Sequence, residues 1–483
     1  MTILSIACLL FQCVLFAEIP SSNISSKTAS YNGNKLYLEG DVKLDHEFGE
    51  MNADLAYLEK DDKLKDFLFS FIHLQKDVRL QFKDHGQIVC EIADLNFHTL
   101  KGQFLPKLGE KVIYTELLEE LKGKKPVMLT LKSDLGEIKI SKKAPDGEYQ
   151  VDEVEASKNV VIEYGDEFSL KAEKAVFQGL TKKSTITAYP KNDAYCSLSH
   201  GPDLIEASLI ECNIEESKLI FHNPRGKLAS VLLPQIQKDD VAFQCKKLIW
   251  DHVNGFLKLT GAVEIQEGTF ATLQTDDEVE FIQAQEDNKK ILKTITSKGI
   301  SHLKYIDRET KMAHELTCYG PIKIDREKLH ATLKSPVTDG KVAEEMQINY
   351  THEAMGIRAD QADVQYKTEE KQTLLSSLSL EGNVHLSSLK KDRSERLAIA
   401  DKIEFDPSSH TFTLSAKSKN KVLFWDAEDQ LSISANQVKI TRDPVSGKDV
   451  VRGVGHVKFA FTAVEQAFLK KVFPFYEPRE MDE

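Results

Sequence analysis

Alternation of apolar and polar residues with a period of two is the feature that most limits what this chain can fold into. It is typical of short strands with one buried and one solvated face, separated by turns of Gly, Asn and Asp. The pattern predicts an all-β fold with few helices. The clearest alternating segments are 36–38 and 42–44 around Gly40-Asp41, 378–380 and 384–386 around Gly382-Asn383, and 402–405, 411–414 and 431–434.

A degenerate repeat accompanies the alternation. Each copy holds a valine after a turn, and then a small residue that is followed by a polar one and a second alternating segment. Units of this kind bury a face only by stacking on their neighbours. The small residues are 40 residues apart between Ala53 and Ala93, 79 between Ala93 and Ala172, and 35 between Ala400 and Ala435. The copies are Val42 with Ala53, Val78 with Ala93, Val160 with Ala172, Val263 with Thr275, Val384 with Ala400, and Val422 with Ala435.

Helical periodicity is rare. Apolar residues at helical spacing predict one helix over Val112–Lys122 and another over Val464–Val472 near the C-terminus. The segment Gly455–Thr462 lies between the last repeat and the second of these helices. Its apolar and polar residues alternate, so we expect it to form a terminal strand.

The first 17 residues differ in composition from the rest. Met1–Ala17 is uncharged and largely apolar, and a Ser- and Asn-rich stretch follows the first charge at Glu18. A short apolar run with a polar break is typical of a secretory signal, here with cleavage after Ala17. We therefore expect an exported protein.

Charge and length exclude several classes. The 63 Lys and Arg against 76 Asp and Glu give a net charge of −13, which offers nucleic acid no electrostatic attraction. A mean hydropathy of −0.34 excludes a polytopic membrane protein. A chain of 483 residues is long enough for about three domains.

No motif for chemistry emerges. Five cysteines follow the apolar leader, none in CxxC spacing; Cys196 and Cys212 could pair, but we expect these cysteines to be buried small apolar residues. The 14 histidines are dispersed, and His352-Glu353 lacks the second histidine of a zinc helix. Phosphate-binding glycine loops and nucleophile elbows are absent from the sequence. We expect no cofactor and no metal.

The repeats resemble a known family at their clearest copies. The sequences EGDVKL…MNADLAYL and LEGNVHL…IADKIEFD are similar to those of LptA/OstA-like proteins, and the likeness is best over 30–105 and 370–460. The resemblance implies tandem open β-jelly-roll modules, a fold shared with LptC and the N-terminal domain of LptD. We expect a signal peptide over 1–17 and modules over 18–145, 146–290 and 291–483.

The resemblance also implies a function. Members of the family carry lipopolysaccharide through the periplasm of Gram-negative bacteria and bridge the inner and outer membranes. An open roll would shield the acyl chains of lipid A in an apolar trough. The inward residues that we expect to line it are Leu36, Leu38, Val42, Leu44, Leu378, Leu380, Val384, Leu386, Ile399, Ile403, Phe405, Phe412, Leu414, Leu431 and Ile433.

Partners follow from the ends of such a roll, where unpaired strands can template pairing. We expect edge-strand pairing with related β-jelly-roll transport proteins or with a second copy, in the periplasm and in association with its membranes. Two other readings remain. One is an exported structural β-solenoid with a filled core, and the other is an exported enzyme that acts on glycans through a carboxylate pair.

Overall fold

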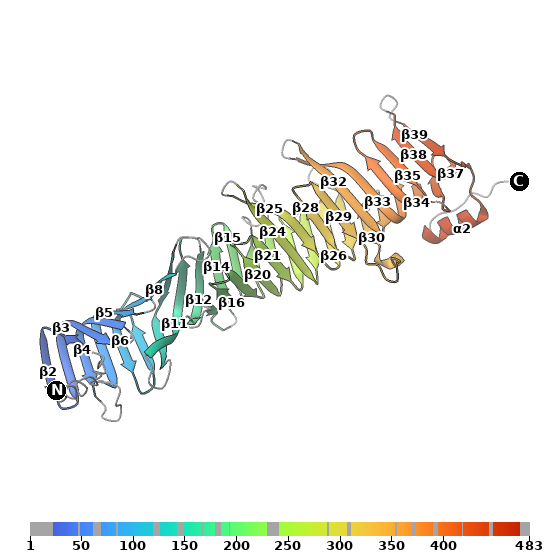
Figure 1. Cartoon of the computed structure of the whole chain (residues 1–483). Coiled ribbons are helices and arrows are strands. Elements are labelled where there is room, and N and C mark those ends of the chain that lie inside the picture. The colour runs from blue at the N-terminus through green and yellow to red at the C-terminus, as the bar shows by residue number, and fades with distance from the viewer. Residues whose placement is uncertain are drawn as a thin grey trace, which may run out of the picture. The chain divides into compact units, whose positions relative to one another are not determined.

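The computed structural model describes residues 23–473 with short gaps, and it confirms the all-β fold. The expected signal segment, Met1–Ala17, lies outside the described residues. Antiparallel strands make up nearly all of the regular structure, with one α-helix among the described residues (Figure 1). The gaps are 47–48, 61–68, 84–85, 119–125, 143–148, 167, 179–184, 193, 229–240, 287–288, 307–310, 353–354, 370–371, 390–394, 418 and 444–447.

The chain divides into two compact units, which are described separately. The first unit comprises residues 1–201 and 208–216. Its strands are β1 (Ile24–Ser25), β2 (Thr28–Asn32), β3 (Lys35–His46), β4 (Gly49–Glu59), β5 (Phe71–Phe82), β6 (Gln87–Asn96), β7 (Lys101–Leu105), β8 (Val112–Leu118), β9 (Val127–Ser133), β10 (Leu135–Lys142), β11 (Tyr149–Tyr164), β12 (Phe168–Gln178), β13 (Thr185–Tyr189), β14 (Cys196–His200) and β16 (Leu209–Asn213).

The second unit comprises residues 202–207 and 217–483. It contains a short 3-10 turn at Glu344–Met346 and the helix α2 (Ala463–Val472). Its strands are β15 (Asp203–Ala207), β17 (Lys218–His222), β18 (Arg225–Lys227), β19 (Val241–Gln244), β20 (Lys247–Asp251), β21 (Phe256–Thr260), β22 (Val263–Glu267), β23 (Ala271–Thr275), β24 (Glu278–Glu286), β25 (Lys289–Ser297), β26 (Ser301–Ile306), β27 (Ala313–Cys318), β28 (Ile322–Asp325), β29 (His330–Lys334), β30 (Ile348–His352), β31 (Met355–Ala359), β32 (Gln361–Glu369), β33 (Gln372–Leu389), β34 (Glu395–Asp406), β35 (Thr411–Ser415), β36 (Val422–Asp426), β37 (Leu431–Ala435), β38 (Gln437–Arg442) and β39 (Asp449–Val454).

Strand pairing sorts the second unit into two layers. Most strands pair with the next strand along the chain through a hairpin and with the strand three positions away. One layer contains β17, β20, β21, β24, β25, β28, β29 and β32, and the other contains β18, β19, β22, β23, β26, β27, β30 and β31. We call these layer A and layer B. The long strands β33 and β34 run through both layers, and they pair in layer A at one end and in layer B at the other.

The repeats of the sequence are the bends at which the chain passes between layers. Two successive residues with φ between +42° and +77° form the bend at Gly40-Asp41, Lys76-Asp77, Lys158-Asn159, Gly261-Ala262 and Gly382-Asn383. Within β3, β5, β11 and β33 the pairing register shifts at this point. The residue that follows each bend is one of the repeat valines, and every one of them is buried.

A second kind of bend lies against the first. Ala53, Ala172 and Ala400 pair with the valines at Val42, Val160 and Val384, and one polar residue then stands opposite the two residues of the first bend. On the strands that carry these alanines, such as β4 and β34, the inward side chains on either side of the bend are three residues apart rather than two. Ala53 and Ala56 are both buried, as are Ala400 and Ile403. At Val78 the partner is Cys90 rather than the expected Ala93.

Two local predictions are wrong. Residues Val112–Leu118 form strand β8, which pairs with β6 and β9, so ladder hydrogen bonds override the helical spacing of the leucines. The last strand in the described part of the chain is β39, and the expected strand Gly455–Thr462 makes only an isolated bridge between Ser434 and Lys458. The C-terminal helix is confirmed as α2, which begins at a capping box formed by Thr462 and Glu465.

The three-module division stays a prediction. Strands β10 and β11 pair with each other across its first boundary, at 145 and 146. Strand β25 runs through its second, at 290 and 291.

Candidate functional site

The inner faces of the two layers of the second unit carry continuous apolar ladders. Cross-strand pairs place residues of the same kind side by side, so each face has a first row at the bends and a second row two residues further out. In layer B the second row consists of Ile265, Leu273, Leu303, Leu316, Tyr350, Ile357, Leu386, Ala398, Phe424 and Ile433. In layer A it consists of Leu257, Phe281, Ile295, Ile324, Ala331, Val364, Leu378, Phe405, Phe412, Ile440 and Val451.

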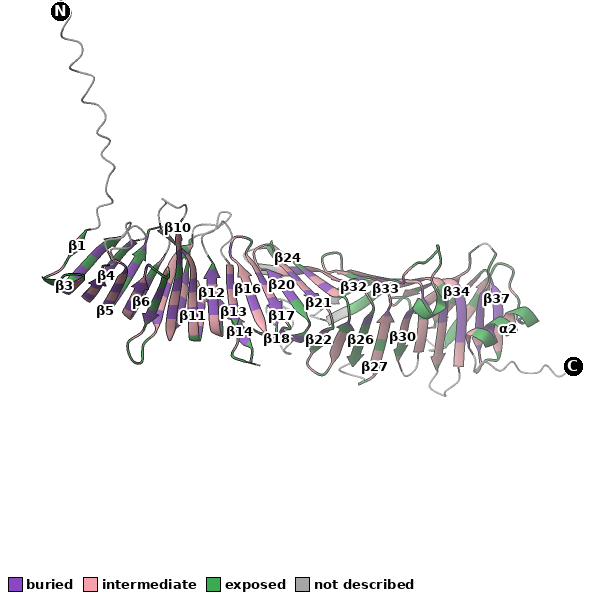
Figure 2. Cartoon of the chain, turned by 90° about the horizontal axis from the view of Figure 1, so that it is seen from below, coloured by how far each residue is buried: buried purple, intermediate pink, exposed green. Residues whose placement is uncertain are grey.

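The two rows differ in exposure. First-row residues such as Cys318, Leu380 and Val384 are buried and belong to one core cluster that both layers share. Second-row residues in the middle of the unit, including Leu316 and Val364, remain partly exposed, whereas members toward the ends of the rows are buried: Leu257, Phe281, Ala398, Phe424 and Ile433. Strands β26, β27 and β30 accordingly show more intermediate and exposed residues in Figure 2 than β4 to β6 do. We call the partly exposed second rows, from Ile265 to Leu386 and from Ile295 to Phe412, the open trough.

The first unit has the same ladders with a sealed interior. Its two second rows are buried at nearly every position, as at Leu58, Leu95, Leu80 and Leu131. Cross-strand pairs run through these rows in the same way as in the second unit. A sealed interior has no apolar surface to offer a ligand, so the open trough is confined to the second unit.

The structure places all but one of the predicted trough residues on inner faces. Leu36, Leu38, Val42 and Leu44 face the sealed interior of the first unit. In the second unit, Leu380, Val384, Ile403 and Leu414 lie in the buried first row. Leu378, Leu386, Phe405 and Phe412 lie in the partly exposed second row. Leu431 and Ile433 lie on the inner face of β37.

Ile399 lies on the opposite face. It packs with Leu397, Leu423 and Leu469 in a separate cluster beneath α2. The bend at Asp401 explains the difference, because the inward positions of β34 are Ala398 and Ala400 before it and Ile403 after it.

Sequence reasoning missed the middle of the open trough. Leu303, Leu316, Ile324, Ile357 and Val364 lie in the stretch where the repeat is weakest. The sequence does carry a signal for these residues, since Ser301–Ile306 and Ile322–Asp325 alternate between apolar and polar residues as clearly as segments 36–38 and 378–380 do.

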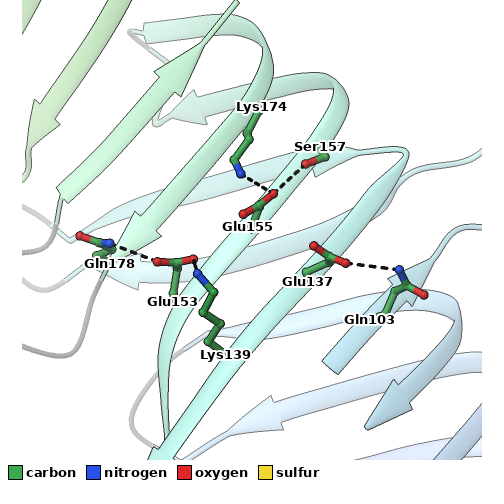
Figure 3. A network of polar contacts seen from close by, with 8 residues as sticks. All are labelled: Gln103, Glu137, Lys139, Glu153, Glu155, Ser157, Lys174 and Gln178. Carbon is green, nitrogen blue, oxygen red and sulfur yellow. Dashed lines mark hydrogen bonds and ion pairs between the residues drawn. The ribbon is translucent and has the colours of Figure 1, made fainter. Parts of the chain in front are cut away.

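A polar hollow on the first unit is the main rival site. Strands β10, β11 and β12 present ion pairs there, and Gln103 of β7 donates a hydrogen bond to Glu137 of β10 beside them (Figure 3). Lys139 Nζ lies 2.5 Å from Glu153 Oε1, and Lys174 Nζ lies 2.6 Å from Glu155 Oε1. The hydrogen bond to Glu153 raises the pKa of Lys139. These residues line two adjoining hollows of about 740 and 250 Å3.

The chemistry of this hollow is that of a structural salt-bridge ladder. These two partly exposed carboxylates are each held by a lysine and by a second donor, Gln178 for Glu153 and Ser157 for Glu155. Every described carboxyl group with a shifted pKa, Glu153 included, is shifted downward. A general acid for glycan hydrolysis needs the opposite direction.

Within the described ranges, no group of three or more His, Cys, Asp or Glu side chains is arranged to hold a metal ion. The five described cysteines are free thiols, and all but the partly exposed Cys212 are buried, so the expected unpaired state is confirmed over the Cys196–Cys212 alternative. No helix in the described part of the chain is long and apolar enough to span a membrane. No model of a known protein family matches this chain, and no curated protein matches it.

Proposed function

We propose that the protein is an exported lipid carrier that shields the acyl chains of lipopolysaccharide in the open trough, and that it serves transport between the inner and outer membranes. The observation that carries the proposal is the partial exposure of the second rows over the open trough, from Ile265 to Leu386 and from Ile295 to Phe412. An interior filled by its own side chains would seal these rows, as happens in the first unit.

The energetics of such binding are favourable. Covering about 300 Å2 of acyl surface contributes roughly 7 kcal/mol at 25 cal/mol per Å2. The contact is non-directional, so it suits flexible chains, while a sugar head group would stay in water at the mouth between the layers.

Edge strands support assembly as part of the same proposal. Among the described residues β2 pairs only with β3, and β39 pairs only with β38. The side chains of Val450 and Val454 on β39 are exposed. An edge with unpaired backbone groups and exposed apolar residues can add a strand from a related roll or from a second copy.

A structural role has its own support in the first unit. Its sealed interior is what a β-solenoid without a ligand requires. We assign lipid binding to the second unit and a supporting role to the first.

The test is site-specific photo-crosslinking in a Gram-negative cell. A benzophenone amino acid at Leu316 faces the trough, and the same amino acid at Thr317 faces outward on the same strand. We expect lipopolysaccharide adducts from position 316 and none from position 317. Equal crosslinking at both positions, or none at 316 in a folded protein, would reject the lipid carrier in favour of the structural module.

A substitution pair gives an independent readout. Leu316→Asp places a charge in the partly exposed second row, where the fold tolerates it better than at a fully buried first-row site such as Val384. Mass spectrometry of lipids extracted from detergent-free protein should show loss of lipid for Leu316→Asp and retention for Thr317→Asp.

A further inference from the structure

Four aromatic rings gather at the mouth of the open trough in layer B. Tyr305 on β26, His314 on β27, and Tyr350 and His352 on β30 lie on the inner face, because each is an even number of residues from a core residue of its strand. The ring centroids of His314 lie 5.9 Å from Tyr305, 6.0 Å from Tyr350 and 5.2 Å from His352. We call these four residues the rim cluster.

The rim cluster stands directly above the apolar second row. Tyr350 belongs to that row, next to Leu316, and His314 is one step further out on the same face. His314 Nδ1 and the Tyr350 hydroxyl are 2.7 Å apart. A hydroxyl can accept as well as donate, so this contact survives protonation of the imidazole.

Charge at the mouth contrasts with that of the chain. The whole protein carries a net charge of −13. On the inner face of layer B, the outermost row runs from Glu267 through Ala271 to Tyr305, His314 and His352, so the acid of that row stands two strands away from Tyr305. The neighbouring acid Glu315 alternates to the outer face, where it pairs with Lys304 at 3.0 Å. Around His314 the mouth therefore gathers imidazole and phenol rings beside the apolar second row.

We propose that the rim cluster binds an anionic head group of the amphiphile whose chains lie in the open trough, with His314 and His352 as the recognising residues. This inference rests on the lipid-carrier function proposed above and adds a ligand class to it, an amphiphile with an acidic group close to its acyl chains. Tyr305 and Tyr350 orient the imidazoles and offer hydroxyl donors to the anion.

The geometry makes binding depend on pH. Strands β26 and β30 are the elements packed against β27, and the titratable groups that they turn toward His314 are Tyr305, Tyr350 and His352. None of these is an acid that would compete for a protonated imidazole. Histidine side chains in general gain their charge as pH falls from 8 to 5. Anion binding should strengthen over that range.

The experiment uses two amphiphiles with the same chain. Tetradecyl sulfate keeps its charge throughout this pH range, and tetradecyl maltoside is neutral. Both are titrated at micromolar concentration into the full chain, with circular dichroism as a check on folding. We expect the sulfate to bind about tenfold more tightly at pH 5.5 than at pH 8, equivalent to about 1.4 kcal/mol, and the maltoside to bind equally at both.

Variants separate the contribution of the rim cluster to binding from that of the apolar second row. His314→Gln with His352→Gln should remove most of the pH dependence and leave maltoside binding intact. His302→Gln is the matched control, because His302 lies on the outer face of the adjacent strand β26, where it contacts Thr317 at 3.1 Å. Leu316→Asp should weaken the binding of both amphiphiles.

The outcomes are distinguishable. If neither amphiphile binds the folded protein, the lipid carrier and the rim site both fail. If both bind with no dependence on pH, or the double variant keeps the dependence, the trough stands and the rim assignment is overturned.

Discussion

Val384 lies directly opposite Ala400 in the pair formed by β33 and β34, immediately after the bend at Gly382 and Asn383. Val384 is completely buried. A small residue opposite the valine leaves room for the two layers to meet at the bend. The same pairing joins Val422 to Ala435 and Val42 to Ala53.

Gly382→Ala tests the bend. Gly382 has a φ of +77°, and a Cβ there would lie 2.3 Å from Asp360 Oδ2. We expect a loss of about 3 kcal/mol in the free energy of unfolding, of which about 1 kcal/mol is backbone strain. Gly340→Ala is the control, since Gly340 has a φ of +74° and open space around it. Urea denaturation of both variants measures the difference, and equal losses would contradict the steric argument.

Arg396→Leu tests a buried ion pair near the C-terminal end. Arg396 Nε lies 2.6 Å from Asp426 Oδ2, and Asp426 is completely buried. Removing the guanidinium takes away the positive charge beside that carboxylate, while the backbone N–H groups of Glu428 and Asp429 still donate to it. We expect a cost of about 3–5 kcal/mol in unfolding free energy.

The double variant Arg396→Leu/Asp426→Asn should recover much of that loss. The exposed pair of Arg225 with Glu206 provides a contrast, because Arg225→Leu should cost at most about 1 kcal/mol. Similar losses from both arginines would refute the role of burial.

His46 should make the first unit sensitive to acid. Burial lowers the pKa of His46 to about 4, and Lys83 adds to the effect. The unfolded chain therefore binds a proton at higher pH than the folded one. Stability should be full above pH 6.5 and fall between pH 6.5 and 4, by up to about 3 kcal/mol. Thermal unfolding of His46→Gln across this range should show a shallower slope, and an unchanged slope would assign the sensitivity elsewhere.

The thiols should be inert in the folded protein. Burial raises the pKa of Cys90 and of Cys212 to about 12, and that of Cys196 to about 11. Only the thiolate reacts, so Ellman's reagent at pH 8 should label these cysteines slowly until denaturant is added. Peptide mass spectrometry after denaturation should find Cys196 and Cys212 labelled separately. A disulfide-linked peptide would disprove the free state.

The all-β class and the bends could be predicted from the sequence because both are local. A Gly-Asp or Gly-Asn pair readily adopts positive φ, and a buried valine must follow it for the layers to meet. The failures arose where tertiary pairing decides. The Leu and Glu residues of Val112–Leu118 favour a helix, but two neighbouring strands bind the segment.

Openness could not be predicted in the same way. Leu80 and Ile88 in the sealed interior and Leu303 and Leu316 in the open trough are the same kinds of residue in the same alternating pattern. Their exposure depends on the distance between the layers, which many side chains set together. The position of Ile399 depended on a change in alternation at Asp401, which only the register reveals.

The bends also impose a parity rule on the evolution of such a chain. Each bend transfers the strand to the other layer, and each hairpin returns it within the same layer. An insertion of one bend and one hairpin would send every later strand to the wrong layer. Only pairs of bends with their pairs of hairpins leave the downstream register intact. Duplication can therefore lengthen such a chain only in steps of four strands. Each step changes the length of the roll and leaves the inner and outer faces of the later strands unchanged.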